Sequence, residues 1–159
     1  VEEEIRQDFT FKNEIAVMCK HRMSTMDTPV ALHIRRGDFL INSANHNNLG
    51  LDYYAECLKK FDNDRIVIIF SDDPAWCKEQ SLFSDDRFLV AEGNDSYTDL
   101  CLMSLCSDFI IANSSFSWWG AWLSKGVDKL VCAPAKWFGP NNIHLDTADM
   151  FPDEWVIVK

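Results

Sequence analysis

The sequence is short of positive charge and contains no long run of apolar residues. Its 159 residues include 15 Lys and Arg against 25 Asp and Glu, which gives a formal net charge of −10. Because a phosphate backbone is bound by a surplus of Lys and Arg, this balance argues against nucleic acid as the main partner. A helix that spans a membrane needs about 20 apolar residues. No run in this sequence approaches that length, so we predict no transmembrane segment in this chain.

Glycine and proline are also scarce. They occupy 6 and 5 positions, while hydrophobic residues make up 47% of the chain. This composition excludes collagen-like, low-complexity and intrinsically disordered chains, and it is typical of a globular protein. A chain of this length buries about 70% of its unfolded surface, so we expect one domain with its own core.

Cysteines with the spacing of a redox or zinc site are absent. None of the six cysteines forms a C-x-x-C pair, and no set of Cys and His has zinc-finger spacing. Most of them lie within apolar stretches, where free cysteine is commonly buried as a small hydrophobic residue. Reduced core thiols indicate a reducing compartment, so a cytoplasmic location is expected.

What the sequence does contain is an alternation of short apolar runs and helix-like segments. The strongest run, Ile66–Phe70, is apolar throughout, which is typical of a strand covered on both faces of a parallel sheet. Ser96 and Asp99 have the spacing of a capping box before a short apolar helix. We predict strands at 30–34, 66–70, 88–91, 109–112, 130–133 and 155–158, and helices at 1–26, 51–61, 74–82, 100–105 and 115–124.

This order of elements predicts a Rossmann-like α/β domain, in which a parallel sheet carries helices on both faces. In open sheets of this kind, ligands bind in the crevice beyond the carboxyl ends of the strands. The loops that follow Ile34, Phe70 and Ala112 are therefore the candidate site.

The loop after the first strand carries two adjacent arginines, Arg35 and Arg36. Charge is costly at the end of a buried strand unless a partner is present, and arginine is suited to bidentate recognition of phosphate. Asp38 could hold one arginine in place, and Gly37 permits a tight turn or a close approach to a ligand. A surface cluster of ion pairs without a ligand is the alternative.

Acidic residues follow the second strand as Asp72 and Asp73. They could bind a metal, a ribose hydroxyl or an acceptor hydroxyl, and one of them could cap the helix that starts at Pro74. The segment 62–64 has the D-x-D spacing of metal-dependent glycosyltransferases. It precedes a strand instead of following one, so we interpret it as a turn.

The loop after the fourth strand leads into the helix at 115–124, which carries three Trp in five residues. A helix N-terminus offers free N–H groups and the positive end of a dipole, which favour a phosphate. The serines could add donors or only cap the helix, and the tryptophans could belong to the core. Asp95, Tyr97 and Asp99 could meet a nucleoside or act as caps, and segment 136–140 could line the same cleft or pack on it.

Three segments together resemble the motifs of the α-1,2-fucosyltransferases, glycosyltransferase family eleven. Segment 33–39 (HIRRGDF) is similar to the H-x-R-R-G-D-Y motif of this family. Segments 70–73 (FSDD) and 111–123 (IANSSFSWWGAWL) resemble its other hallmark segments, in the expected order. Phe39 stands where the family usually has Tyr, so this position has no hydroxyl to offer.

The resemblance implies transfer of L-fucose from GDP-β-L-fucose to the 2-hydroxyl of a galactose-terminated glycan, with inversion and without a required metal or cofactor. It also implies a fold of two Rossmann-like domains, the GT-B type, with the donor site mainly in the C-terminal half. We expect residues 1–159 to form one GDP-sugar donor-binding domain of a two-domain enzyme, without the N-terminal acceptor-side domain. An active enzyme and an inactive isolated half are both open at this point.

The resemblance also suggests roles for individual residues. Arg35 and Arg36 are the candidates for diphosphate binding, one of them structural, and His33 and Asp38 would shape that site. Asp38 and Asp72 are the local options for a general base, and Asp72 and Asp99 are weaker candidates for contacts with sugar hydroxyls. The donor-binding candidates on the loop after the fourth strand are Asn113, Ser114, Ser115 and Ser117.

Two further functions remain as alternatives. A non-catalytic module that binds a GDP-sugar or a carbohydrate would share the fold and the binding residues but lack turnover. A response-regulator-like domain using segment 71–73 ranks last, because it leaves the arginine pair unexplained. An enzyme that acts on a lipid-linked glycan would be membrane-associated, and a domain in the Golgi lumen is the alternative location.

Overall fold

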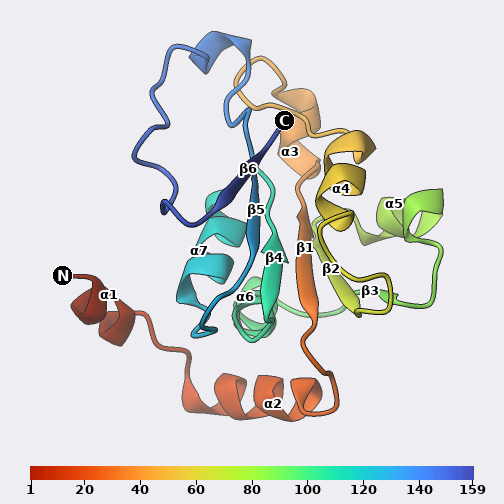
Figure 1. Ribbon diagram of the computed structural model, residues 1–159, viewed down its shortest axis with the longest axis vertical. Coiled ribbons are helices and arrows are strands. Elements are labelled where there is room, and N and C mark those ends of the chain that lie inside the picture. The colour runs from red at the N-terminus through yellow and green to blue at the C-terminus, as the bar shows by residue number, and fades with distance from the viewer.

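The computed structural model describes residues 1–159 and contains one six-stranded sheet (Figure 1). All strand pairs are parallel, and the order across the sheet is β3-β2-β1-β4-β5-β6. The predicted strands are all present, with ends shifted by one or two residues. Their bounds are β1 Val30–Ile34, β2 Val67–Ser71, β3 Phe88–Val90, β4 Asp108–Ile110, β5 Val131–Pro134 and β6 Val156–Val158.

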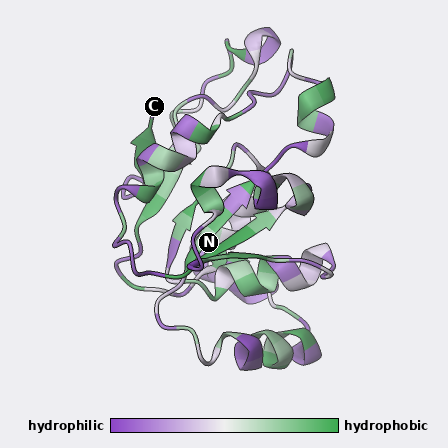
Figure 2. Cartoon of the chain, turned by 90° about the vertical axis from the view of Figure 1, so that its right-hand side faces the viewer, coloured by the Kyte–Doolittle hydropathy of each residue, from purple (hydrophilic) through white to green (hydrophobic).

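Helices cover both faces of the sheet, which confirms the predicted Rossmann-like architecture. Alternate residues of a strand point to opposite faces. Leu32 of β1 accordingly packs with Tyr54 on one face, whereas Ala31 packs with Leu102 on the other. The central strands are the most hydrophobic part of the chain (Figure 2). The helices are α1 Glu2–Asp8, α2 Asn13–Met23, α3 Gly37–Ile41, α4 Leu51–Leu58, α5 Pro74–Glu79, α6 Ser96–Ser104 and α7 Ser115–Leu123, with 3-10 turns at Ser81–Phe83 and Pro140–Asn142.

The single N-terminal helix predicted for residues 1–26 is wrong, because two helices occupy this region. The break follows from a tertiary contact: the ring of Phe9 stacks on Trp119 of α7, with centroids 4.6 Å apart. Arg6 lies over the ring of Trp122, 3.9 Å from its centroid, and donates to the Trp122 carbonyl. These contacts hold α1 against α7 while α2 packs on α6.

The predicted capping box is also wrong. Asp95, not Ser96, is the N-cap of α6, because its carboxylate accepts from the backbone N–H of Thr98 at 2.8 Å. Asp99 instead accepts from the side chain of Asn94. The cap predicted for the helix at Pro74 is present, since Asp73 accepts from the N–H of Trp76, and segment 62–64 is a turn as interpreted.

The strand order creates a topological switch point between β1 and β4. The chain runs outward through β2 and β3 on one side, then returns to β4 and runs outward through β5 and β6 on the other. Leu32 of β1 is in register with Ile110 of β4. Three residues further along the chain from this pair lie Arg35 and Asn113, just beyond the ends of the two strands. The loops that carry two of the predicted motifs therefore leave the sheet side by side. This is the position where such folds bind ligands.

All six cysteines are buried free thiols, as predicted. No helix of the chain combines the length and the apolar character that a membrane crossing requires. No group of three or more His, Cys, Asp or Glu side chains is arranged to hold a metal ion.

The contact between α6 and α7 depends on Gly120, which has no room for a side chain. A Cβ built at this position would collide with the side chain of Met103, lying 2.8 Å from its Cγ. Met103 is 1% exposed and belongs to the core cluster on this face of the sheet. We therefore expect Gly120→Ala to lower the free energy of unfolding by about 1–3 kcal/mol through overpacking.

Urea denaturation of the variant measures this loss as a lower midpoint at an unchanged slope. Gly126→Ala is the matched control, because a Cβ there meets its neighbours only at 3.6 Å or more. Equal midpoints for the two variants would show that the α6–α7 contact does not require glycine.

Candidate functional site

A cavity of about 820 Å³ opens at the carboxyl edge of the sheet, over the switch point. Its floor is formed by the ends of β1 and β2, and its walls by the starts of α3, α6 and α7 and by the loop after β5. The three loops predicted to form the site therefore meet in one place. Of the predicted site residues, the lining includes His33, Arg35, Asp72, Asp99, Asn113, Ser114 and Ser115.

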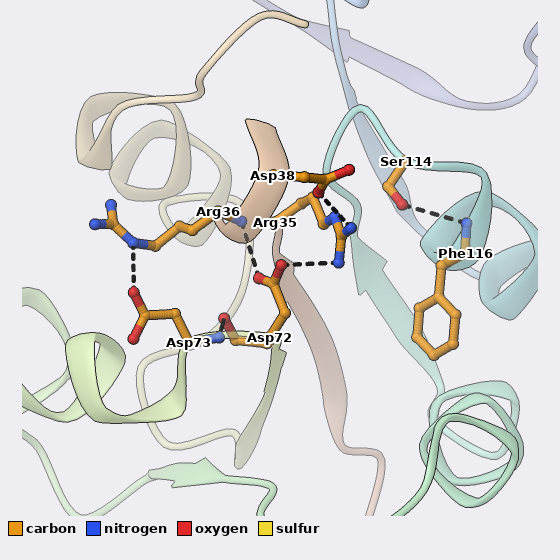
Figure 3. A network of polar contacts seen from close by, with 8 residues as sticks. Arg35, Arg36, Asp38, Asp72, Asp73, Ser114 and Phe116 are labelled. Atoms are coloured by element: carbon orange, nitrogen blue, oxygen red, sulfur yellow. Dashed lines mark hydrogen bonds and ion pairs between the residues drawn. The ribbon is translucent and has the colours of Figure 1, made fainter. Parts of the chain in front are cut away.

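The Asp72 carboxylate, at the end of β2, organises the neighbouring loop after β1 (Figure 3). One oxygen pairs with the Arg35 guanidinium at 2.8 Å, and the other accepts from the backbone N–H of Arg36 at 2.9 Å. A Cβ at Gly37 would collide with this carboxylate, so glycine is required there for a close approach. Asp38 pairs with the same guanidinium from its other side. Arg35 is thereby fixed with its charged end at the cavity.

Arg36 points the other way, toward α5 (Figure 3). Its Nε donates to Asp73 at 3.1 Å, and its guanidinium lies over the Trp76 ring, 3.8 Å from the centroid. The side chain does not line the cavity. Of the two arginines, Arg36 is therefore engaged by neighbouring side chains, and Arg35 is the one that lines the cavity.

Asp38 also lies outside the cavity lining and is 59% exposed. Its role in the structure is to brace Arg35. Both carboxylates proposed as general bases, Asp38 and Asp72, are paired with this one guanidinium.

Helix α7 begins at the cavity wall. Ser114 is its N-cap, and the hydroxyl accepts from the N–H of Phe116 at 3.3 Å (Figure 3). Ser115, in the first turn, is exposed at the cavity. Ser117 is fully buried and its hydroxyl donates to the carbonyls of Ala112 and Ser114, so its predicted contact with a donor is not supported. The positive end of the helix dipole and its first N–H groups face the same space as Arg35.

His33 forms part of the floor and is only 5% exposed. Its Nδ1 is buried without a hydrogen-bond partner, and its ring lies 5.4 Å from the ring of Phe116. Burial, with a smaller contribution from the positive charge of Arg35, lowers the pKa of His33 to about 3. The imidazole is therefore neutral at physiological pH, and one of its nitrogens remains unsatisfied beneath the site.

Asn113 is buried, and its side chain forms hydrogen bonds to two neighbouring loops. Its side-chain N–H groups donate to the carbonyls of Asn47 and Trp137, each at 2.8 Å. The N–H groups of this amide therefore tether two loops, and its predicted contact with a donor stays a prediction for a side chain that lines the cavity. Asp99 lies on the α6 wall, where burial raises its pKa despite the hydrogen bond from Asn94.

Aromatic side chains complete the cavity. Trp137 and Phe138 line it, which confirms the first of the two alternatives for segment 136–140, and Trp118 and Trp119 line it as well. The sequence reasoning missed His46, which stacks on Phe39 with centroids 4.0 Å apart. It lies in a polar loop without a local signal, and its position depends on an antiparallel bridge to Phe138, far away in the sequence.

The lowered pKa of His33 predicts a specific dependence of stability on pH. Between pH 6.5 and about 3, this histidine binds a proton in the unfolded chain but not in the folded one. Its contribution is therefore complete above pH 6.5 and is lost as the pH falls toward 3. Within that window the free energy of unfolding should fall by up to about 1.4 kcal/mol per pH unit because of this group.

We expect His33→Gln to remove this component, so that its unfolding free energy falls less steeply than that of the wild type between pH 6 and 4. His21→Gln is the control, because His21 is exposed on α2. The free energy of unfolding is measured by urea denaturation at each pH. If it falls in parallel for wild type and His33→Gln, the result would contradict a buried neutral imidazole.

Comparisons with known proteins agree with the geometry. The model of the family "Glycosyl transferase family 11" matches residues 1–159. An alpha-1,2-colitosyltransferase from Escherichia coli is 40% identical over 139 residues, which cover 82% of this chain and 47% of the relative. The O-antigen biosynthesis glycosyltransferase WbnK, also from Escherichia coli, is 36% identical over 88% of this chain and 46% of the relative. This chain thus spans about half the length of these relatives.

More distant similarities point the same way. The galactoside alpha-(1,2)-fucosyltransferase 1 of Mus musculus is 25% identical over 78% of this chain and 38% of its own length. The crystal structure of POFUT1 in complex with GDP superposes with a TM-score of 0.55 at 16% identity, covering 77% of this chain and 46% of the other, and it supports the fold alone. On the match of the family model to the entire chain, this protein belongs to glycosyltransferase family 11.

Proposed function

We propose that this chain is the donor-binding domain of an inverting α-1,2-fucosyltransferase, which uses GDP-β-L-fucose and a galactose-terminated acceptor. The observation that carries the proposal is the single arginine, Arg35, held by two carboxylates at the switch point opposite the start of α7. This arrangement occurs in a member of family 11, whose matched relatives are named as transferases that form α-1,2 linkages.

The diphosphate of the donor is proposed to lie between Arg35 and the first turn of α7. A guanidinium has five N–H donors, and the two ion pairs leave several of them for a ligand. The Ser115 side chain and the dipole of α7 face the same space. The Arg35 guanidinium and the N-terminal end of α7 therefore offer N–H donors to the anionic part of the donor at one place in an acidic protein.

The proposed mechanism follows from where charge develops. As the bond between fucose and phosphate breaks, negative charge grows on the diphosphate, and fixed donors stabilise it there. The acceptor hydroxyl attacks the opposite face of the sugar, which inverts the anomeric centre. Arg35 and α7 supply the counter-charge that a metal ion provides in other transferases, so we propose that no metal is required.

The three carboxylates in and beside the cavity have two different proposed roles. Asp72 and Asp38 are proposed to position Arg35, because both are paired with it. No Lys, Arg or His side chain lies within salt-bridge distance of Asp99, and burial raises the pKa of this carboxylate. A raised pKa suits a carboxylate that accepts a proton, and we assign Asp99 to a hydroxyl of the donor or the acceptor sugar.

A colitosyl donor is the second candidate, favoured by the 40% identity to an alpha-1,2-colitosyltransferase. Colitose is fucose without its 3-hydroxyl, so the two donors present the same diphosphate and differ at one polar group of the sugar. Isothermal titration calorimetry of the chain with GDP-fucose, GDP-colitose and GDP-mannose separates these possibilities by affinity. Binding of none of the three would contradict a donor-binding domain.

The two arginines give a sharp test of diphosphate binding. We expect Arg35→Ala to weaken GDP binding about 100-fold in isothermal titration calorimetry, because it removes charge-assisted hydrogen bonds to phosphate. Arg36→Ala is the matched control. Its guanidinium lies outside the cavity, and its backbone N–H, which anchors Asp72, is retained.

The control is expected to bind GDP within about threefold of the wild type, since surface ion pairs contribute little. Unchanged GDP affinity in Arg35→Ala would remove the proposed phosphate role. An equal loss in both variants would show that the two arginines act as one electrostatic patch, in contradiction to the geometry.

A further inference from the structure

Two chain segments that are distant in the sequence bind each other above the cavity. The Gly139 N–H donates to the Asn45 carbonyl at 2.9 Å, and the Asn141 N–H donates to the Ala44 carbonyl at 2.8 Å. His46 and Phe138 form an antiparallel bridge beside them. We call the paired segments 42–50 and 136–142 the roof, because both contribute aromatic side chains to the cavity.

The roof fits together only because residue 139 is glycine. A Cβ at Gly139 would lie 2.7 Å from the Ser43 carbonyl oxygen and 2.8 Å from that of Ala44. Both contacts are with backbone, which cannot swing aside as a flexible side chain could. A side chain at this position must therefore push the two segments apart.

Asn113 joins the roof to the start of α7. Its side-chain amide has two N–H donors, and these reach one segment each: the Asn47 carbonyl and the Trp137 carbonyl, both at 2.8 Å. The residue is 4% exposed, so water does not compete for these bonds. The next residue is Ser114, the N-cap of the helix proposed to face the diphosphate.

The roof in turn contacts the wall that holds the arginine. His46 stacks on Phe39 of α3, with ring centroids 4.0 Å apart and planes 8° from parallel. The Arg35 guanidinium lies 5.4 Å from the centroid of the same Phe39 ring, within the range of a cation–π contact. A continuous set of contacts therefore runs from Asn113 through the roof to the far side of the Arg35 side chain.

We infer that Asn113 is a positioning residue: it does not bind the donor itself, but locks the two roof segments together and so fixes Phe39 and Trp137 at the cavity. Its consequence for catalysis rests on the proposed function, whereas its effect on the roof does not. Loss of the tether should leave Arg35 and α7 in place while the aromatic wall becomes mobile.

The experiment compares Asn113→Asp with Gly139→Ala. Asn113→Asp keeps the size of the side chain but removes both donors and sets a carboxylate against two carbonyl oxygens. Gly139→Ala opens the roof from its other end, and no atom of Gly139 lines the cavity. Asn63→Asp, in an exposed turn, is the control for the added negative charge.

Hydrogen exchange of the Gly139 and Asn141 amides reports the roof directly, without any ligand. We expect both test variants to exchange at least tenfold faster at these amides than the wild type and the control, with strand β1 still protected. If hydrogen exchange at these two amides is unchanged in Asn113→Asp, Asn113 does not hold the roof segments together, whether or not the chain binds GDP.

Donor affinity then separates positioning from direct binding. In isothermal titration calorimetry we expect both variants to raise Kd for the GDP-sugar by a similar factor, about tenfold, and the double variant to lose little more than either single one. A large loss of affinity in Asn113→Asp with normal affinity in Gly139→Ala would show that the amide itself binds the donor, and would overturn the positioning role. A chain that binds no GDP at all contradicts the proposed function, while the exchange result still decides the tether.

Discussion

The site depends on one carboxylate at the end of a buried strand. Asp72 accepts from the backbone N–H of Arg36 and pairs with the guanidinium of Arg35, and it approaches so closely that residue 37 must be glycine. These contacts set the path of the chain as it leaves β1, and they send adjacent arginines in opposite directions. In an acidic protein, a fixed and accessible guanidinium at the switch point is the feature that distinguishes this cavity from the rest of the surface.

The remaining parts of the cavity complement that charge. The imidazole of His33 stays neutral beneath it, since burial and the neighbouring guanidinium both oppose protonation. The start of α7 faces it with N–H donors and a helix dipole. The aromatic rings of Trp118, Trp119 and Trp137 line its sides. A guanidinium, helix N–H donors and aromatic walls are the features on which the proposed binding of a nucleoside diphosphate sugar rests.

Much of the fold followed from the sequence, because runs such as Ile66–Phe70 are typical of buried strands and their alternation with helices restricts the topology. The three loops of the site could be located for the same reason. Side-chain direction could not be predicted: it separates Arg35 from Arg36, buries Ser117, and directs the N–H groups of Asn113 to neighbouring loops. The break after α1 and the position of His46 depend on contacts between distant segments. For the cap of α6 the sequence offered both Asp95 and a capping box of Ser96 and Asp99, and local geometry decides for Asp95.

The central claim is that the diphosphate binds between Arg35 and the first turn of α7. A crystal structure of this chain with GDP tests it most directly. The account predicts phosphate oxygens within hydrogen-bond distance of the Arg35 guanidinium and of the Ser115 side chain or backbone N–H, with Arg36 still paired to Asp73. A diphosphate that contacts Arg36, or that lies elsewhere on the chain with Arg35 still enclosed by its two carboxylates, would contradict it.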